Sequence, residues 1–147
     1  MITAMQDVPV GVVGAGNVGL GTLQILSENS EQIARKLGFG LRVAAVCSPT
    51  IAVKDLPVGL NGVRRVTNWR DVVEDPSIDV VCELIGGRTT AAELIRATIG
   101  AGKSVVTANK ELMALEGAEI WDLAIQKGIN LAMEASVCGG IPIHAVL

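Results

Sequence analysis

The chain has 147 residues, of which half are hydrophobic and 18% are charged. This length predicts one domain with a buried core, and this composition excludes a disordered chain. The formal net charge of −3 offers no basic surface to nucleic acid or to an anionic membrane, and two Trp, one Phe and no Tyr leave little to stack on nucleobases. We therefore expect small molecules as partners, with no nucleic acid and no membrane.

The sequence carries no pattern typical of secretion or of a membrane span. Residues 1–9 lack a basic segment followed by an apolar one, and no run approaches the roughly 18 apolar residues that a spanning helix needs. The three cysteines are odd in number and have no C-x-x-C spacing, which argues against a disulfide framework and against a zinc site. We expect a cytoplasmic protein.

An apolar strand leads into a glycine-rich turn near the amino terminus. Residues 10–13 are Val-Gly-Val-Val, and Gly14, Gly16 and Gly19 form the pattern G-x-G-x-x-G. Between a strand and a helix, this pattern holds a dinucleotide pyrophosphate: the first glycine permits the turn, the second admits the phosphates, and the third lets the helix pack closely. Residues 18–37 have leucines and isoleucines at helical spacing, which predicts a helix with its amides facing the anion. The alternative is a glycine-rich turn without a ligand.

The rest of the chain alternates between strand and helix patterns. We expect strands at 41–47, 78–84, 105–106 and 130–134, helices at 69–73, 90–101 and 110–127, and an irregular surface loop at 50–68. This alternation predicts an α/β fold of the Rossmann type, a doubly wound and mostly parallel sheet with helices on both faces. Ligands of such sheets bind at the carboxyl ends of the strands, where the polar and glycine-rich residues of this sequence gather.

The end of the expected second strand bears on the choice of dinucleotide. Residues 47–49 are Cys-Ser-Pro, so the Asp or Glu that bonds the ribose of NAD in many Rossmann domains is absent there. Ser48 would not repel the 2′-phosphate of NADP. Lys54, Arg64 or Arg65 of the following loop is a candidate to neutralise that phosphate. We therefore favour NADP over NAD.

Lys110 follows another expected strand. At a carboxyl end, its ammonium can lie near a phosphate, the nicotinamide or a substrate oxygen. The alternative is that Asn109 caps the next helix and that Lys110 is a solvated charge.

Glu134 precedes a Gly-Gly turn at residues 139–140. Carbonyl oxygens of such a turn can join the carboxylate in binding a hard cation, whereas the alternative is a turn without a ligand. We interpret Cys138 as a structural thiol, because the sequence places no activating partner near it except His144.

Four segments in order resemble the N-terminal, cofactor-binding part of homoserine dehydrogenases: residues 14–19, 79–87, 105–110 and 134–143. The last two are the most specific, and the resemblance spans nearly the whole chain. It implies an NAD(P)-binding Rossmann domain at residues 1–140, with residues 141–147 beginning the connection to a substrate domain. The implied reaction is the NAD(P)-dependent interconversion of L-homoserine and L-aspartate 4-semialdehyde, in threonine, methionine and isoleucine biosynthesis.

The resemblance also implies roles for individual residues. It implies that Asn17, Val18, Thr89, Ala108 and Lys110 contact the cofactor. With the residues of the glycine turn and of the end of the second strand, the expected cofactor-binding residues are Gly14, Gly16, Asn17, Val18, Gly19, Ser48, Thr89, Ala108 and Lys110. A sodium ion would be held by Glu134, Val137, Gly139 and Ile141.

The family's catalytic Lys and Asp belong to the following domain, so the resemblance places them downstream of Leu147. We therefore expect no catalytic residue in this chain, no activity from it alone, and a homo-oligomer for the whole protein. The alternatives are another Rossmann dehydrogenase of amino acids and a non-catalytic nucleotide-sensing module.

Overall fold

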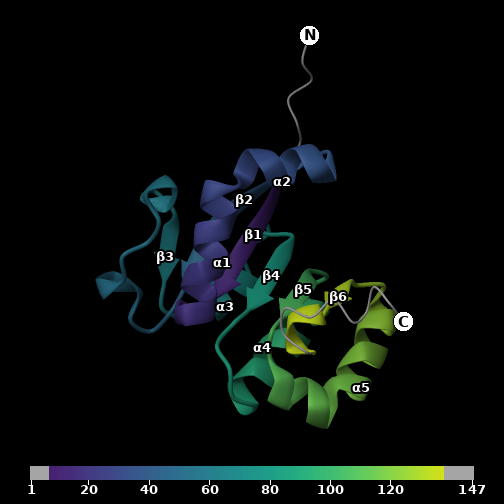
Figure 1. Ribbon diagram of the computed structural model, residues 1–147. Coiled ribbons are helices and arrows are strands. Elements are labelled where there is room, and N and C mark those ends of the chain that lie inside the picture. The colour runs from purple at the N-terminus through teal and green to yellow at the C-terminus, as the bar shows by residue number, and fades with distance from the viewer. Residues whose placement is uncertain (1–6, 138–147) are drawn as a thin grey trace.

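The computed structural model describes residues 7–137. Its centre is a six-stranded sheet of order β3-β2-β1-β4-β5-β6, in which every pair of neighbours is parallel (Figure 1). The strands are β1 (Asp7–Val13), β2 (Gly40–Cys47), β3 (Arg64–Val66), β4 (Val80–Glu83), β5 (Ser104–Thr107) and β6 (Leu131–Ala132). This order is that of the Rossmann fold, which confirms the predicted fold class.

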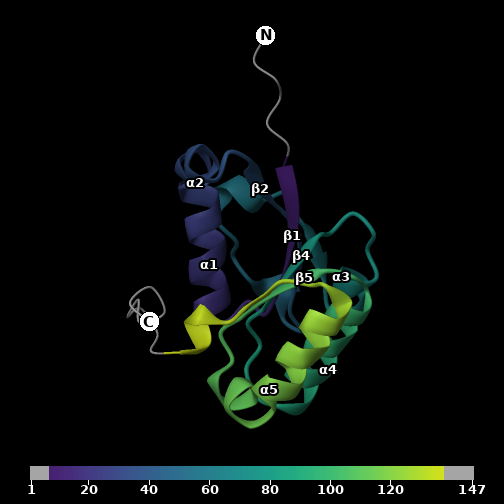
Figure 2. The ribbon, with the colours of Figure 1, turned by 90° about the vertical axis from the view of Figure 1, so that its right-hand side faces the viewer.

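Helices cover both faces of the sheet. The helices are α1 (Asn17–Glu28), α2 (Ser30–Leu37), α3 (Arg70–Val73), α4 (Thr89–Gly100) and α5 (Lys110–Lys127), with 3-10 turns η1 (Ile51–Val53), η2 (Val58–Leu60) and η3 (Glu134–Ser136). Figure 2 shows α1 and α2 on one side of the sheet and α3, α4 and α5 on the other. Within residues 7–137, no helix has the length and apolar character to cross a membrane.

The central strand β1 contributes to the core on both of its faces. Val10 and Val12 pack in one cluster with Leu23 of α1, whereas Val13 packs in a second cluster with Val72 of α3. All five side chains are at most 4% exposed. Parallel strands covered on both faces have continuous apolar sequences, which is why this strand was predictable.

The prediction of one helix over residues 18–37 is wrong, because the chain breaks at Asn29 into α1 and α2. Asn29 has φ −111° and ψ 16°, and its amide and its side chain both donate to the carbonyl oxygen of Ile25, at 3.0 and 3.3 Å. Side-chain bonds of this kind compete with helix continuation. No residue of α2 is buried, so packing does not hold α2 in line with α1.

The expected loop at residues 50–68 is likewise only partly right, because it contains η1, η2 and β3. Ala45 of β2 pairs with Arg64, the first residue of β3. The sequence of β3 is Arg-Arg-Val and both arginines are exposed, so it lacks the apolar pattern of a buried strand. Its strand conformation comes from the neighbouring edge of β2, and it leads the chain to the carboxyl end of the sheet.

Candidate functional site

A cleft of about 430 Å³ lies at the carboxyl ends of β1 and β4. The strand order reverses here, since the chain leaves β1 towards β2 and leaves β4 towards β5, and ligands of open α/β sheets bind at this point. The lining residues come from the ends of β1, β2 and β4 and from the segment after β3: Val13, Gly14, Ala15, Gly16, Cys47, Ser48, Pro49, Thr67, Trp69, Leu84, Ile85, Gly86 and Thr90.

The three glycines of the turn occupy different environments. Gly14 has φ +112°, and a Cβ atom there would overlap the backbone of Leu84. A Cβ atom on Gly19 would overlap the carbonyl oxygen of Gly14, so α1 starts in direct contact with the turn. Gly16 is exposed, and a Cβ atom there would meet nothing within 4 Å. Two glycines are therefore required by the fold, whereas the third leaves open space at the cleft.

The amino terminus of α1 faces this open space. Gly16 is its N-cap residue, no side chain caps it, and no acidic residue lies in its first turn. Asn17 and Val18 are exposed. The first amides of an α-helix lack intrahelical partners and carry a partial positive charge. The site thus has the donors and the access that a dinucleotide pyrophosphate requires.

Ser48 lies at one end of the cleft, directly after β2. It is 7% exposed, and its hydroxyl oxygen accepts a hydrogen bond from the Thr50 amide at 3.3 Å. Among residues 7–137, none of those that line the cleft carries a carboxylate. Two arginines considered for a 2′-phosphate are held by other groups: Arg64 Nη2 lies 2.5 Å from Asp75 Oδ2, and Arg65 donates to the carbonyl oxygen of Lys54 at 3.1 Å.

The cleft is also lined by Pro49, Thr67 and Trp69, for which the sequence alone predicted no role in the site. Thr67 and Trp69 follow β3, so recognition of β3 would have pointed to them as residues at a strand's carboxyl end. Trp69 is half-buried against the core, and the Arg70 guanidinium carbon lies 4.3 Å from the centre of its ring. Of this pair, Trp69 lines the cleft.

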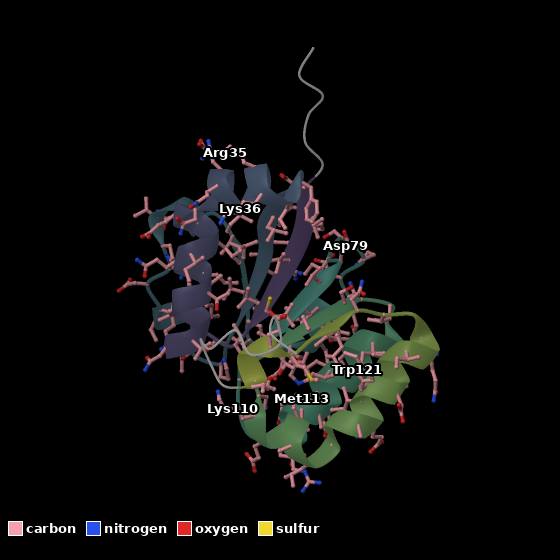
Figure 3. The ribbon with its side chains drawn as sticks, turned by 45° about the vertical axis from the view of Figure 1, so that its right-hand side comes forward. Arg35, Lys36, Asp79, Lys110, Met113 and Trp121 are labelled. Atoms are coloured by element: carbon pink, nitrogen blue, oxygen red, sulfur yellow. The ribbon has the colours of Figure 1, made fainter. Side chains whose placement is uncertain are left out.

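The other end of the site lies over β4 and β5. Thr89 begins α4 and is exposed, and Ala108 follows β5. Asn109 caps α5, because its side-chain oxygen accepts from the Leu112 amide at 3.1 Å. Lys110 is exposed on the side of the sheet where the strands end, far from Asp79, which directly precedes β4 (Figure 3). Thr89, Ala108 and Lys110 are therefore near this end but outside the lining of the cleft.

Two of the four candidate sodium ligands lie in the described part of the chain. The expected strand at residues 130–134 is wrong in its extent, because β6 ends at Ala132 and Glu134 begins η3. The Val137 amide donates to the Glu134 carbonyl oxygen at 3.0 Å, so one tight turn holds both residues.

Five positions named from the sequence lie outside the described residues. Two of them are Cys138, interpreted as a structural thiol, and His144. Gly139 and Ile141 are the remaining candidate sodium ligands, and Leu147 is the residue after which the catalytic groups are expected. The sodium site beyond Val137 and the location of the catalytic residues therefore stay predictions.

Cys47 and Cys82, the cysteines of the described part of the chain, are both buried, and Cys47 lines the cleft. Burial, with a smaller contribution from the charge of Asp71, raises the pKa of the Cys47 thiol to about 11. Burial alone raises the pKa of Cys82 to about 11. Both thiols are protonated at neutral pH and are poor nucleophiles.

Known proteins resemble this chain in sequence and in structure. The family described as "Homoserine dehydrogenase, NAD binding domain" matches residues 14–134. A homoserine dehydrogenase of Pseudomonas aeruginosa is 46% identical over 95% of this chain and 31% of its own length, and that of Neisseria gonorrhoeae is 37% identical over 97% and 32%. The crystal structure of a homoserine dehydrogenase from Thiobacillus denitrificans has a TM-score of 0.87 at 44% identity, over 95% of this chain and 32% of that one.

The structure of Staphylococcus aureus homoserine dehydrogenase has a TM-score of 0.84 at 29% identity, over 93% of this chain and 34% of that chain. The chain thus spans about a third of the length of these relatives. The family match covers the glycine turn, every cleft-lining residue except Val13, and all described strands that follow β1. The chain therefore belongs to the family of homoserine dehydrogenase NAD-binding domains, whose cofactor is a nicotinamide dinucleotide.

Proposed function

We propose that this chain is the cofactor-binding domain of a homoserine dehydrogenase, an enzyme that interconverts L-homoserine and L-aspartate 4-semialdehyde in threonine, methionine and isoleucine synthesis. The observation that carries this proposal is the open approach to the α1 amino terminus at Gly16, at the strand reversal of a domain from this family. The glycine turn orients the pyrophosphate there, through the exposed amides of Asn17 and Val18.

The two halves of the cofactor extend in opposite directions from this point. The adenosine half lies towards Ser48 and Trp69, because β2 carries the ribose contacts in Rossmann domains. The nicotinamide half lies over the ends of β4 and β5, where Thr89, Ala108 and Lys110 follow. When bound, the dinucleotide supplies or accepts the hydride; the chain's own task is to hold the ring in a fixed orientation.

The groups that act on the substrate belong, in this proposal, to a following domain downstream of Leu147. A dehydrogenase needs an acid/base group within hydrogen-bond reach of the alcohol. The relatives are about three times as long as this chain, which gives room for such a domain beyond the NAD-binding domain of residues 1–140. The whole protein is expected to be a homo-oligomer and this chain alone to be inactive.

Two finer assignments accompany the proposal. NADP is favoured over NAD, since Ser48 stands where a carboxylate would repel the 2′-phosphate and no described residue of the cleft lining carries a carboxylate. A sodium ion is assigned to the turn that begins at Glu134 and includes Val137, with Gly139 and Ile141 as further ligands.

Titration with NADPH and with NADH tests the proposal. Trp69 lines the cleft, so we expect energy transfer from its indole to the reduced nicotinamide of the bound cofactor. Calorimetry provides a dissociation constant that does not depend on fluorescence. A Gly16→Val variant, folded but unable to bind, is the control. Absence of binding by either cofactor at millimolar concentration would overturn the proposal.

A further inference from the structure

Glu83, the last residue of β4, has a buried carboxyl group beside the site. It is 1% exposed and takes part in none of the ion pairs found within residues 7–137. Its Oε1 accepts hydrogen bonds from the backbone amides of Ile85 at 3.0 Å and Gly86 at 3.3 Å. Its Oε2 accepts from Thr107 Oγ1 at 2.5 Å. Burying a carboxyl group is costly unless it is hydrogen-bonded, and here both carboxyl oxygens have partners.

Thr107, the last residue of β5, extends this hydrogen-bond network. Its hydroxyl oxygen accepts from the Asn109 amide at 3.1 Å, and its carbonyl oxygen accepts from Ser136 Oγ at 2.9 Å. The side-chain amide of Asn109 donates to the carbonyl oxygen of Gly87 at 2.6 Å. The bonds therefore close a ring that runs from Glu83 through Thr107, Asn109 and the Gly86–Gly87 loop back to Glu83.

This ring, hereafter the Glu83 ring, holds a segment that has little else to order it. Gly86 and Gly87 both have φ +70° and are exposed, and no side chain of their own anchors them. Glycine pairs have a large conformational entropy, so external hydrogen bonds decide which conformation the loop adopts. Here those bonds come from a β4 carboxylate and from the N-cap residue of α5.

We propose that Glu83 is a positioning residue: through the Glu83 ring it fixes the Gly86–Gly87 loop and the start of α5 under the nicotinamide half of the cofactor. The inference rests on the proposed function, since that function places the nicotinamide over the ends of β4 and β5. Glu83 is too deeply buried to touch the cofactor itself and acts through the loop. The adenosine end, at Ser48 and Trp69, lies on the other side of β1 and is not part of the ring.

The test compares two ligands that differ only in the nicotinamide half: NADPH and 2′-phospho-ADP-ribose. Calorimetry on the 147-residue chain provides both dissociation constants for two variants. Thr107→Val removes the bond between the two side chains, and Glu83→Gln replaces the acceptor Oε2, to which the Thr107 hydroxyl donates, by an amide donor. We expect NADPH to bind about tenfold more weakly, the effect of one buried hydrogen bond, and 2′-phospho-ADP-ribose to change less than about twofold. Thr107→Ser retains the hydroxyl and should restore most of the difference. If the wild type binds NADH more tightly than NADPH, the two ligands to compare are NADH and ADP-ribose.

A control variant separates positioning from general stability. Lys103 is 7% exposed at the opposite end of β5, where its ammonium donates to the carbonyl oxygens of Asp75 and Ile78. Lys103→Met should lower the Tm and leave the ratio of the two dissociation constants unchanged. The inference would be overturned if the ratio of the two dissociation constants stayed unchanged in both Glu83→Gln and Thr107→Val, whether neither ligand or both ligands equally bound more weakly. Failure of the wild type to bind either ligand would instead overturn the proposed function.

Discussion

Gly19 packs so closely against Gly14 that a Cβ atom on Gly19 would overlap the Gly14 carbonyl oxygen. Gly16, between them, has no atom within 4 Å of the place where its Cβ would lie. The glycines of this one short motif are therefore required for different reasons. The fold requires glycine at positions 14 and 19, whereas only a ligand requires it at position 16.

Substitutions at these positions should separate binding from folding. Gly16→Val should abolish detectable NADPH binding and leave the Tm nearly unchanged, because the backbone at Gly16 has φ −80° and ψ −166°, which valine adopts readily. Gly19→Ala should destabilise the fold by roughly 1–3 kcal/mol through overpacking. Thermal unfolding and calorimetric titration measure the two effects. Undiminished affinity in Gly16→Val would contradict the placement of the pyrophosphate.

Ser48→Asp should change cofactor preference. A carboxylate at the end of β2 would repel a 2′-phosphate and accept hydrogen bonds from an unmodified ribose, so we expect the ratio of NADPH to NADH dissociation constants to rise about tenfold or more. Ser30→Asp adds the same charge on exposed α2 and should leave the ratio as it is. A Ser48→Asp chain with wild-type preference would show that the ribose lies elsewhere.

Asp75 should make folding stability depend on acid pH. Hydrogen bonds from the hydroxyl (2.7 Å) and amide (2.8 Å) of Ser77, followed by the charges of Arg64 and Lys103, hold the pKa of Asp75 below its usual range. A lowered carboxyl pKa stabilises the fold fully above the unfolded value of about 3.9, and this contribution is lost as the pH falls through the lowered pKa. Asp75→Asn should therefore lower the Tm at pH 7, and its difference from the wild type should shrink below about pH 4.

Urea unfolding at a series of pH values measures this dependence. Asp122→Asn, which removes a charge from the exposed surface of α5, is the matched control and should show no comparable convergence with the wild type. A constant difference between Asp75→Asn and wild type from pH 7 to pH 3 would refute the ionised role of Asp75.

Cys47 and Cys82 should resist thiol reagents in the folded chain. With pKa values of about 11 for both, only about one thiol in a thousand is ionised at pH 8. In a Cys138→Ser background, an aromatic disulfide reagent should label neither cysteine appreciably in buffer and both at once in guanidinium chloride. Labelling of the native chain at the rate of a free thiol would show that Cys47 is more accessible than its burial indicates.

The predictable elements were those with a strong local signal. β1, β2, α4 and α5 have long apolar or helical patterns, and Gly128, with φ +66°, ends α5 where the sequence predicts it. The short strand β3 was missed, because its exposed Arg64 and Arg65 resemble a loop and its conformation depends on β2. The break at Asn29 was missed because the apolar spacing continues across it.

The sequence by itself determined the fold class, the glycine turn and the family resemblance, because these depend on residue types at short, regular spacings. Only the tertiary structure decided which side chains meet at the site. Glu83 and Thr107 are 24 residues apart, and Thr107 and Ser136 are 29 apart, so their bonds exist only because parallel strands end at the same edge. Trp69 reaches the cleft for the same reason, since β3 pairs with β2. Parallel neighbours are joined by long crossovers, and no local pattern in a sequence records which strand ends they bring together.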